Sequence, residues 1–298
     1  MRDAGRSCSS DAIDRLVARC DELGTTACVG IDPMLERLPE VVRHAAGSPV
    51  EAIERFSIGI VEAVAGIAPV VKPQAAMFER YGSLGWRALE RVVDRARRAG
   101  LAVILDAKRG DIGSTSEHYA AAFSSMGADW VTVSPYLGAS GIVPFIDAGL
   151  GVFVLVRTSN PDSDELQEAC LEGGGTVAEC VAQMVARLGD GSRGASGLSS
   201  VGAVVGATKA LGAGARLRAR MPDQMFLVPG VGAQGGSIAD VRTMLRAGAP
   251  TSGALGVVVN ASRSVIYPSD QEASKLDWPD AIARAARGFA DELREGLA

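Results

Sequence analysis

The chain has few of the residues that build disulfide frameworks or histidine-based metal and catalytic sites. Its 298 residues include five cysteines and two histidines, and no two cysteines form a CxxC pair. An odd number of scattered cysteines predicts reduced thiols in a cytoplasmic protein and argues against a disulfide scaffold or a zinc site. His44 and His118 lie far apart in the sequence. We therefore expect neither a bound metal nor a Ser/His/Asp triad.

Long apolar runs and basic clusters are also lacking. No stretch reaches the roughly 18 apolar residues that a membrane-spanning helix needs, and the N-terminus lacks the apolar core of a secretory signal. The formal net charge is −5, and no Lys/Arg-rich run marks a nucleic-acid binder. These absences predict a cytoplasmic protein that has neither a membrane nor nucleic acid as its partner. A small anionic ligand would then need a local cationic pocket.

Hydrophobic residues gather instead in eight short runs, separated by turns and by amphipathic stretches. Near-continuous apolar runs of this length are typical of parallel strands that are buried on both faces. Eight alternations of strand and helix favour a (β/α)₈ TIM barrel, with an open doubly wound sheet as the alternative. No GxGxxG motif follows the first run, which counts against a dinucleotide-binding sheet. The eight runs are Ala27–Ile31, Ala68–Val71, Leu101–Leu105, Trp130–Val133, Val152–Val156, Val201–Val205, Met225–Val228 and Leu255–Val259.

The stretches between the runs show no domain boundary, so residues 1–298 are expected to form a single barrel domain. The segment 161–200 is longer than one crossover helix needs, and it ends in the Gly/Ser-rich stretch Gly189–Gly197. This composition predicts an inserted flexible segment. Apolar residues at three-to-four spacing predict helices over Glu51–Val64, Trp86–Arg98, Ser116–Ser125 and Ala281–Leu297.

Polar residues that follow the apolar runs are the candidates for chemistry, because the active site of such a barrel lies at the carboxyl ends of its strands. The densest cluster contains Asp106 and Lys108, whose alternation along a strand places both side chains on one side. A lysine held between carboxylates keeps its proton and is placed to deliver it as a general acid. A solvated ion-pair cluster is the alternative. Asp32 and Lys72, at two other strand ends, argue against it.

A glycine-rich loop follows the seventh run, from Pro229 to Gly236, and Arg263 follows the eighth. Glycines let backbone N–H groups approach an anion, and barrels of this kind often bind phosphate with these two loops. An arginine forms bidentate pairs with phosphate. The sequence therefore favours a phosphate site here, although an ordinary glycine turn beside a surface arginine remains the alternative.

The segment from Asp106 to Thr115 resembles the DxKxxDIxxT signature of the orotidine 5′-phosphate decarboxylase family. Further agreement extends along most of the chain. The Lys-Arg-Gly-Asp variant at Lys108 and the long 161–200 segment resemble the longer bacterial branch of the family. The other matching segments are Gly30–Pro33, Val71–Pro73, Thr158–Asn160, Val228–Gly230 and Ala261–Arg263.

The resemblance implies decarboxylation of orotidine 5′-monophosphate to UMP without a cofactor, and it implies a role for each matching residue. Lys108 would protonate C6 of the pyrimidine, and Asp106 would lie beside the departing carboxylate. Lys72 and Asp111 would complete the charge array. In the family, the residues that correspond to Asp111 and Thr115 reach the neighbouring subunit's site, which implies a homodimer.

The same resemblance implies how the rest of the nucleotide is held. Asp32 would bind the ribose hydroxyls, and Ser159 would bind the amide edge of the pyrimidine. The phosphate and its neighbourhood would be contacted by Pro229, Gln234, Gly235 and Arg263.

Three other functions remain open at this point. A related sugar-phosphate decarboxylase shares the DxKxxD pattern, but it is Mg²⁺-dependent and carries a glutamate where this chain has Lys72. A Schiff-base aldolase needs a lysine with a depressed pKa, whereas flanking carboxylates raise the pKa of a lysine. A barrel that binds nucleotides without catalysis is the third.

Overall fold

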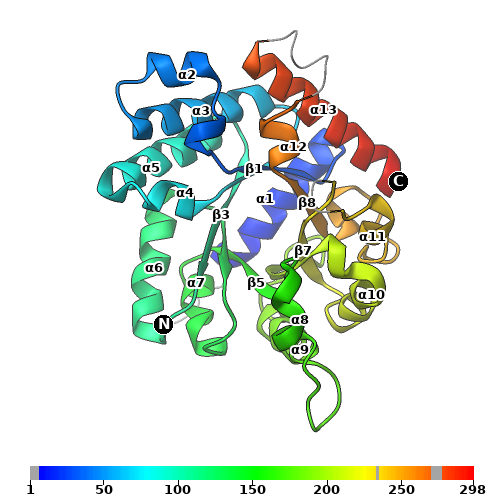
Figure 1. The fold of residues 1–298 in the computed structure, drawn as a ribbon. Coiled ribbons are helices and arrows are strands. Elements are labelled where there is room, and N and C mark those ends of the chain that lie inside the picture. Colours follow the sequence, from blue (N-terminus) through cyan, green and yellow to red (C-terminus); the bar gives the residue numbers. More distant parts are fainter. Residues whose placement is uncertain (1–6, 233–234, 270–276) are drawn as a thin grey trace.

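Eight parallel strands form a closed barrel in the order β1 to β8, as the computed structural model of residues 7–232, 235–269 and 277–298 shows (Figure 1). Each strand pairs with its sequence neighbours, and β8 returns to β1. The predicted TIM barrel is therefore confirmed, and the open sheet is excluded. The strands are β1 Ala27–Ile31, β2 Val70–Pro73, β3 Ala102–Arg109, β4 Trp130–Val133, β5 Gly151–Arg157, β6 Ser199–Val205, β7 Gln224–Pro229 and β8 Val257–Ala261.

Helices connect the strands and surround the barrel (Figure 1). The four helices predicted from apolar spacing are present as α3, α5, α6 and α13, each beginning two to four residues earlier than predicted. The α-helices are α1 Ser7–Leu23, α2 Glu40–Ala45, α3 Pro49–Val64, α4 Ala75–Glu79, α5 Gly82–Arg98, α6 Gly113–Met126, α7 Val143–Asp147, α8 Asp164–Gln167, α9 Val177–Gly189, α10 Ala210–Arg220, α11 Ile238–Arg242, α12 Arg263–Ile266 and α13 Trp278–Leu297. Short 3₁₀ turns are η1 Leu35–Arg37, η2 Ala139–Gly141, η3 Pro161–Ser163, η4 Ala207–Lys209 and η5 Gly253–Leu255.

The strands bury both of their faces, in two separate cores. Outward-facing residues such as Val71 and Val103 pack with the surrounding helices. Alternate residues such as Val70 and Ile104 face the barrel interior. The same alternation carries Asp106 into the interior row of β3 at the carboxyl end of the barrel. The strand pattern that builds the core therefore also positions the charged residues.

Helix α1 closes the opposite end of the barrel, a role that the sequence analysis did not predict. Its residues Ile13 and Leu16 are fully buried and belong to the interior core. Trp130 and Phe153 fill the same core with rings stacked at 4.5 Å. Gly151 lies against Trp130, where an added Cβ would come within 2.3 Å of the indole. These side chains thus fill the interior at its base.

The 161–200 segment contains two helices, α8 and α9, and a hairpin turn in which Cys170 pairs with Thr176. Thr176 and Glu179 form a capping box at the start of α9. The Gly/Ser-rich stretch that follows is tied to α1 by the bond from Ala195 N–H to Asp14 Oδ1, 2.8 Å. Its flexibility stays a prediction. Within the described ranges, no helix is both long and apolar enough to cross a membrane.

Candidate active site

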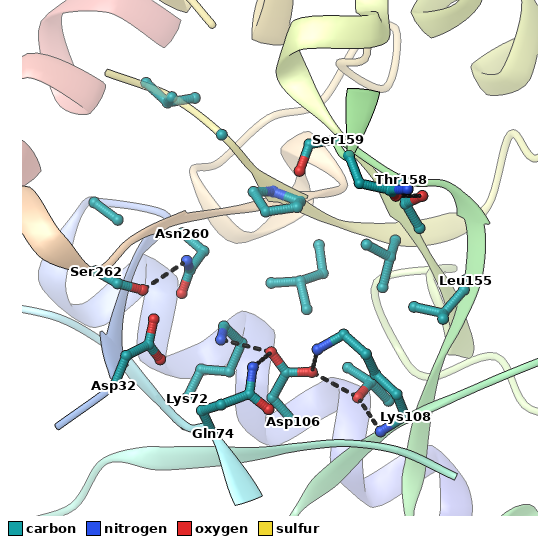
Figure 2. Close-up of a pocket in the computed structure, with 18 of the residues that line it drawn as sticks. Asp32, Lys72, Gln74, Asp106, Lys108, Leu155, Thr158, Ser159, Asn260 and Ser262 are labelled. Atoms are coloured by element: carbon teal, nitrogen blue, oxygen red, sulfur yellow. Dashed lines mark hydrogen bonds and ion pairs between the residues drawn. The ribbon is translucent and has the colours of Figure 1, made fainter. Parts of the chain in front are cut away.

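A cavity of about 460 Å³ opens at the carboxyl end of the barrel, and residues at the ends of all eight strands line it (Figure 2). Because parallel strands all point the same way, residues far apart in the sequence meet at this one mouth. The predicted residues Asp32, Lys72, Asp106, Lys108 and Ser159 are all among those that line it. Pro229 and Arg263 also line the cavity.

Asp106 is held between two ammonium groups on one wall of the cavity (Figure 2). Lys72 Nζ lies 2.7 Å from Oδ2 of Asp106, and Lys108 Nζ lies 2.5 Å from Oδ1. The side chains of Lys72 and Asp106 are only 6% and 8% exposed, whereas that of Lys108 is 46% exposed. The Lys72–Asp106 ion pair is thus buried inside the protein, whereas the Lys108 side chain is open to the cavity.

The two lysines fix the ionisation state of Asp106. Burial alone would raise the pKa of Asp106, but the charges of Lys72 and Lys108 outweigh it and hold that pKa well below its usual range. Burial likewise acts to lower the pKa of Lys72, but Asp106 and Asp32 outweigh it and raise that pKa above its usual range. At neutral pH the wall therefore carries an aspartate and a permanently charged lysine.

Two further side chains bond to Asp106 and were missed by the sequence analysis. Gln74 Nε2 donates to Oδ2 at 3.3 Å, and Thr132 Oγ1 donates to Oδ1 at 2.8 Å. Thr132 also accepts a hydrogen bond from the backbone N–H of Lys108, at 2.9 Å. Thr132 lies inside an apolar strand run, so its position alone suggested only core packing.

The backbone of Lys108 is strained. Its φ of 47° is the one positive value at a non-glycine residue in the described part of the chain. For L-residues the left-handed region costs roughly 1–2 kcal/mol. Strain of this kind persists where neighbouring contacts hold it, and it is common at functional sites. Here it accompanies an irregular pairing of β3 with β4 between Leu105 and Arg109.

Asp32 and the end of β8 form the corner of the cavity next to Lys72 (Figure 2). Asp32 Oδ1 is buried and has no hydrogen-bond partner among the described residues. The hydroxyl of Tyr267 holds the Asp32 loop, accepting from Met34 N–H at 2.7 Å and donating to Asp32 O at 3.3 Å. Asn260 Nδ2 donates to Ser262 Oγ at 3.3 Å. An unpaired carboxylate oxygen at this corner is placed to accept hydrogen bonds from ligand hydroxyls.

The wall opposite the array is formed by the segment after β5, which includes Thr158 and Ser159 (Figure 2). The buried Arg157 anchors this segment, with its Nε 3.0 Å from Oε1 of Glu168. Gln167 of α8 accepts from the N–H of Thr158 at 2.9 Å and donates to its hydroxyl at 2.9 Å. The 161–200 segment therefore supports one wall of the cavity.

The glycine-rich loop after β7 lines the cavity through Pro229, Gly230 and Val231. Gly235 is not among the lining residues, and its N–H donates to Gly232 O at 2.9 Å within the loop. Gln234 lies outside the described residues. Arg263, at the start of α12, is exposed and forms no ion pair within the described ranges. Its exposed side chain is among those that line the cavity.

Asp111 and Thr115 do not line the cavity of their own chain. Asp111 Oδ1 instead accepts a hydrogen bond from Ile112 N–H at 2.8 Å. Three apolar side chains near them are exposed, by 63% for Ile112, 82% for Tyr136 and 47% for Leu137. Exposed apolar side chains thus lie close to Asp111, which like Thr115 is outside the cavity that the Lys72–Asp106–Lys108 array lines.

Comparisons with known proteins agree on one family. Residues 26–275 match the model of the orotidine 5′-phosphate decarboxylase / HUMPS family. An orotidine 5′-phosphate decarboxylase of Rhodopirellula baltica is 41% identical over 91% of this chain and 95% of its own length. One of Streptomyces coelicolor is 41% identical over 95% of this chain and 97% of its own.

Solved structures give the same result. A crystal structure described as a putative orotidine 5′-phosphate decarboxylase from Streptomyces avermitilis matches with a TM-score of 0.79 and 37% identity, over 96% of this chain and 95% of that one. The OMP decarboxylase of Leishmania donovani matches with a TM-score of 0.75 and 32% identity, over 96% and 98%.

Proposed function

Because this chain belongs to the orotidine 5′-phosphate decarboxylase / HUMPS family, we propose that it converts orotidine 5′-monophosphate to UMP and CO₂, the last step of pyrimidine nucleotide synthesis, with Lys108 as the proton donor. The observation that carries the proposal is the Lys72–Asp106–Lys108 array at the mouth of the barrel. The array brings a cation that faces the cavity next to an anion that stays ionised.

The proposed reaction balances with the Lys108 ammonium as the proton donor and water as the source that restores its proton. The bond between C6 and the substrate carboxylate breaks, and its electron pair remains on C6 as CO₂ leaves. The Lys108 ammonium gives its proton to C6, and the resulting amine regains a proton from water. Lys108 is 46% exposed, which leaves it accessible for that step. No electron acceptor is needed, since the pair is captured by a proton.

The array stabilises the charge that develops on C6. A fixed ammonium beside a developing carbanion needs no reorganisation at the moment of reaction, and such preorganised electrostatics is usually the largest catalytic contribution. Asp106 would lie beside the substrate carboxylate. Its two oxygens accept from Lys72, Gln74, Lys108 and Thr132, which keeps the aspartate ionised and fixed.

The other cavity walls would hold the remainder of the nucleotide. Ser159, across the cavity from the array, would bind the amide edge of the pyrimidine (Figure 2). The free Oδ1 of Asp32 would accept from ribose hydroxyls. Pro229 and Arg263 would border the phosphate, and the parts that Gln234 and Gly235 take in phosphate binding remain predictions. Binding energy from these remote groups would close the site and exclude water.

A homodimer would complete the site. Asp111 and Thr115 lie outside the cavity of their own chain, and the exposed Ile112 and Leu137 lie near Asp111. An apolar surface of this kind is typical of an interface, and a two-fold axis through it would carry Asp111 of each subunit towards the other's array.

The rival functions fit the charged wall less well. A Mg²⁺-dependent sugar-phosphate decarboxylase would have to hold a divalent cation beside Lys72, whose raised pKa keeps it positively charged. A Schiff-base aldolase needs a neutral amine, and the raised pKa of Lys72 keeps that amine protonated. Barrels that only bind nucleotides have no need of a buried ion pair, which is costly to desolvate.

The loss of orotate absorbance on addition of orotidine 5′-monophosphate tests the proposal, with and without a metal chelator. We expect turnover in both conditions. Lys108→Ala should abolish turnover, while UMP binding measured by calorimetry stays within a few-fold of the wild type. Arg98→Ala, which removes a cation that is 73% exposed on α5, is the control and should change neither quantity. Normal turnover by Lys108→Ala would show that another group supplies the proton.

A further inference from the structure

Thr132 lies opposite the functional part of β3. Between two regular pairs of residues, β3 has three residues where β4 has one. The three are Asp106, Ala107 and Lys108, and the one is Thr132. An irregularity of this kind interrupts the backbone hydrogen bonds between neighbouring strands and bends the chain. This part of β3 therefore depends on a side chain for a contact that the backbone supplies at the regular pairs of β3 with β4.

The Thr132 hydroxyl contacts both functional residues at once. It accepts from Lys108 N–H at 2.9 Å and donates to Asp106 Oδ1 at 2.8 Å. A backbone N–H only donates and an ionised carboxylate only accepts, so the hydroxyl has one arrangement that satisfies both. Thr132 is 1% exposed, so its hydroxyl has little contact with bulk solvent.

Thr132 bonds to the backbone of the strained residue, Lys108. Lys108 has a φ of 47°, a conformation that L-residues adopt where the surroundings hold it. Its side chain is 46% exposed, so packing around that side chain restrains it weakly. The hydrogen bond to Thr132 restrains the backbone from which the ammonium projects, and the second bond ties that backbone to Asp106.

We propose that Thr132 is a positioning residue, whose hydroxyl fixes the Lys108 backbone against the Asp106 carboxylate and so sets where the Lys108 ammonium points. Thr132 acts through these two residues and exchanges no proton with the substrate. An effect of Thr132 on kcat rests on the proposed decarboxylase function, whereas its effect on the position of Lys108 does not.

Thr132→Val keeps the shape of the side chain and removes the hydroxyl. In its crystal structure we expect Lys108 to leave the left-handed region or its ammonium to move away from Asp106. We expect kcat to fall about 100-fold, the effect of a misplacement of about 1 Å, with KM changed little because other strands hold the ribose and phosphate. Thr132→Ser keeps the hydroxyl and should restore most of kcat.

Thr25→Val is the matched control. Thr25 is 2% exposed, and its hydroxyl donates to Ala290 O at 3.2 Å, in a contact that does not reach the cavity. This variant should lose stability without losing kcat. If Thr132→Val does not give folded protein, Thr132→Cys provides the same comparison with a weaker donor.

The crystal structure of the variant decides the inference. If Lys108 keeps both its backbone conformation and its contact with Asp106 after the hydroxyl is removed, the inference is overturned. A wild-type protein without decarboxylase activity would contradict the proposed function instead, and the positions of Lys108 and Asp106 in Thr132→Val would still decide the role of Thr132.

Discussion

At the scale of single residues, Asp106 sets the electrostatics of the cavity wall. It accepts hydrogen bonds from four side chains, those of Lys72, Gln74, Lys108 and Thr132. Two of these are cations, so the array carries one positive charge more than Asp106 neutralises. That excess favours an anionic substrate in a protein whose formal net charge is −5. Over the whole cavity, the three cations Lys72, Lys108 and Arg263 exceed the two carboxylates Asp32 and Asp106 by one.

The same pairing makes stability depend on pH. Asp106→Asn should lower the free energy of unfolding near pH 7 by about 3–5 kcal/mol, because Lys72 would remain buried without its anion. The folded-state pKa of Asp106 is depressed, so its stabilisation is fully present above the unfolded pKa of about 3.9 and declines progressively as pH falls from there towards the folded-state pKa. Urea unfolding of both proteins from pH 3 to pH 8 measures this. The difference between them should shrink at the acidic end, and a difference that is constant over the range would contradict the assignment.

At the scale of secondary-structure elements, α1 and the strands divide the barrel into a closed base and a reactive mouth. The interior core, with Leu16, Trp130 and Met225, occupies the base, and the charged array lies at the other end. Leu16, Trp130 and Met225 do not line the cavity, whereas Val204 and Leu227 of the same core do. Stability and chemistry should therefore respond to different substitutions.

Leu16→Ala tests that separation. Leu16 is fully buried in the interior core, and removal of a buried leucine side chain typically costs 2–5 kcal/mol. We expect a loss of this size in urea unfolding, with kcat unchanged at temperatures where the variant is folded. Arg15→Ala, one position away and 56% exposed, is the control and should cost no more than about 1 kcal/mol. A large fall in kcat for the folded Leu16→Ala variant would mean that the base and the mouth are coupled.

The strands and most of the array followed from the sequence because both depend on local pattern. Apolar runs marked every strand, and the rule that barrel chemistry lies at strand ends found Asp32, Lys72, Asp106 and Lys108, all of which line the cavity. The extent of β3 did not follow, since it continues to Arg109, past the end of its apolar run. A hydrophobicity pattern does not extend a strand into charged residues, so it predicts an end that is too early.

The contacts that the sequence did not predict depend on three-dimensional register. Thr132 sits in an apolar run, and it meets Lys108 only because β3 and β4 pair irregularly. Leu16 and Ile13 have helical apolar spacing, but no local signal says that their helix closes the barrel. Gln74 directly follows the matching segment Val71–Pro73, but its bond to Asp106 requires the ends of β2 and β3 to lie side by side.

At the scale of the whole molecule, the cavity of one chain is not lined by two of the residues that the DxKxxDIxxT signature implies for the site. Asp111 and Thr115 lie outside the cavity, and the exposed side chains of Ile112 and Leu137 lie near Asp111. In a two-fold symmetric dimer the same surface serves both subunits, so each chain would give its Asp111 and receive its partner's. The proposed reaction would then require two chains for each complete array.

Subunit mixing tests that requirement directly. Lys108→Ala and Asp111→Ala should each be nearly inactive alone. In a mixed dimer, the Asp111→Ala chain keeps its own Lys108 and would receive an intact Asp111 from the other chain, so one site would be complete. Unfolding and refolding an equimolar mixture would place about one quarter of all sites in this state, because half of the dimers are mixed and each has one complete site. We expect kcat per site to return to about that fraction of the wild type. A mixture that stays as inactive as its components, although sedimentation shows dimers, would mean that Asp111 serves its own chain.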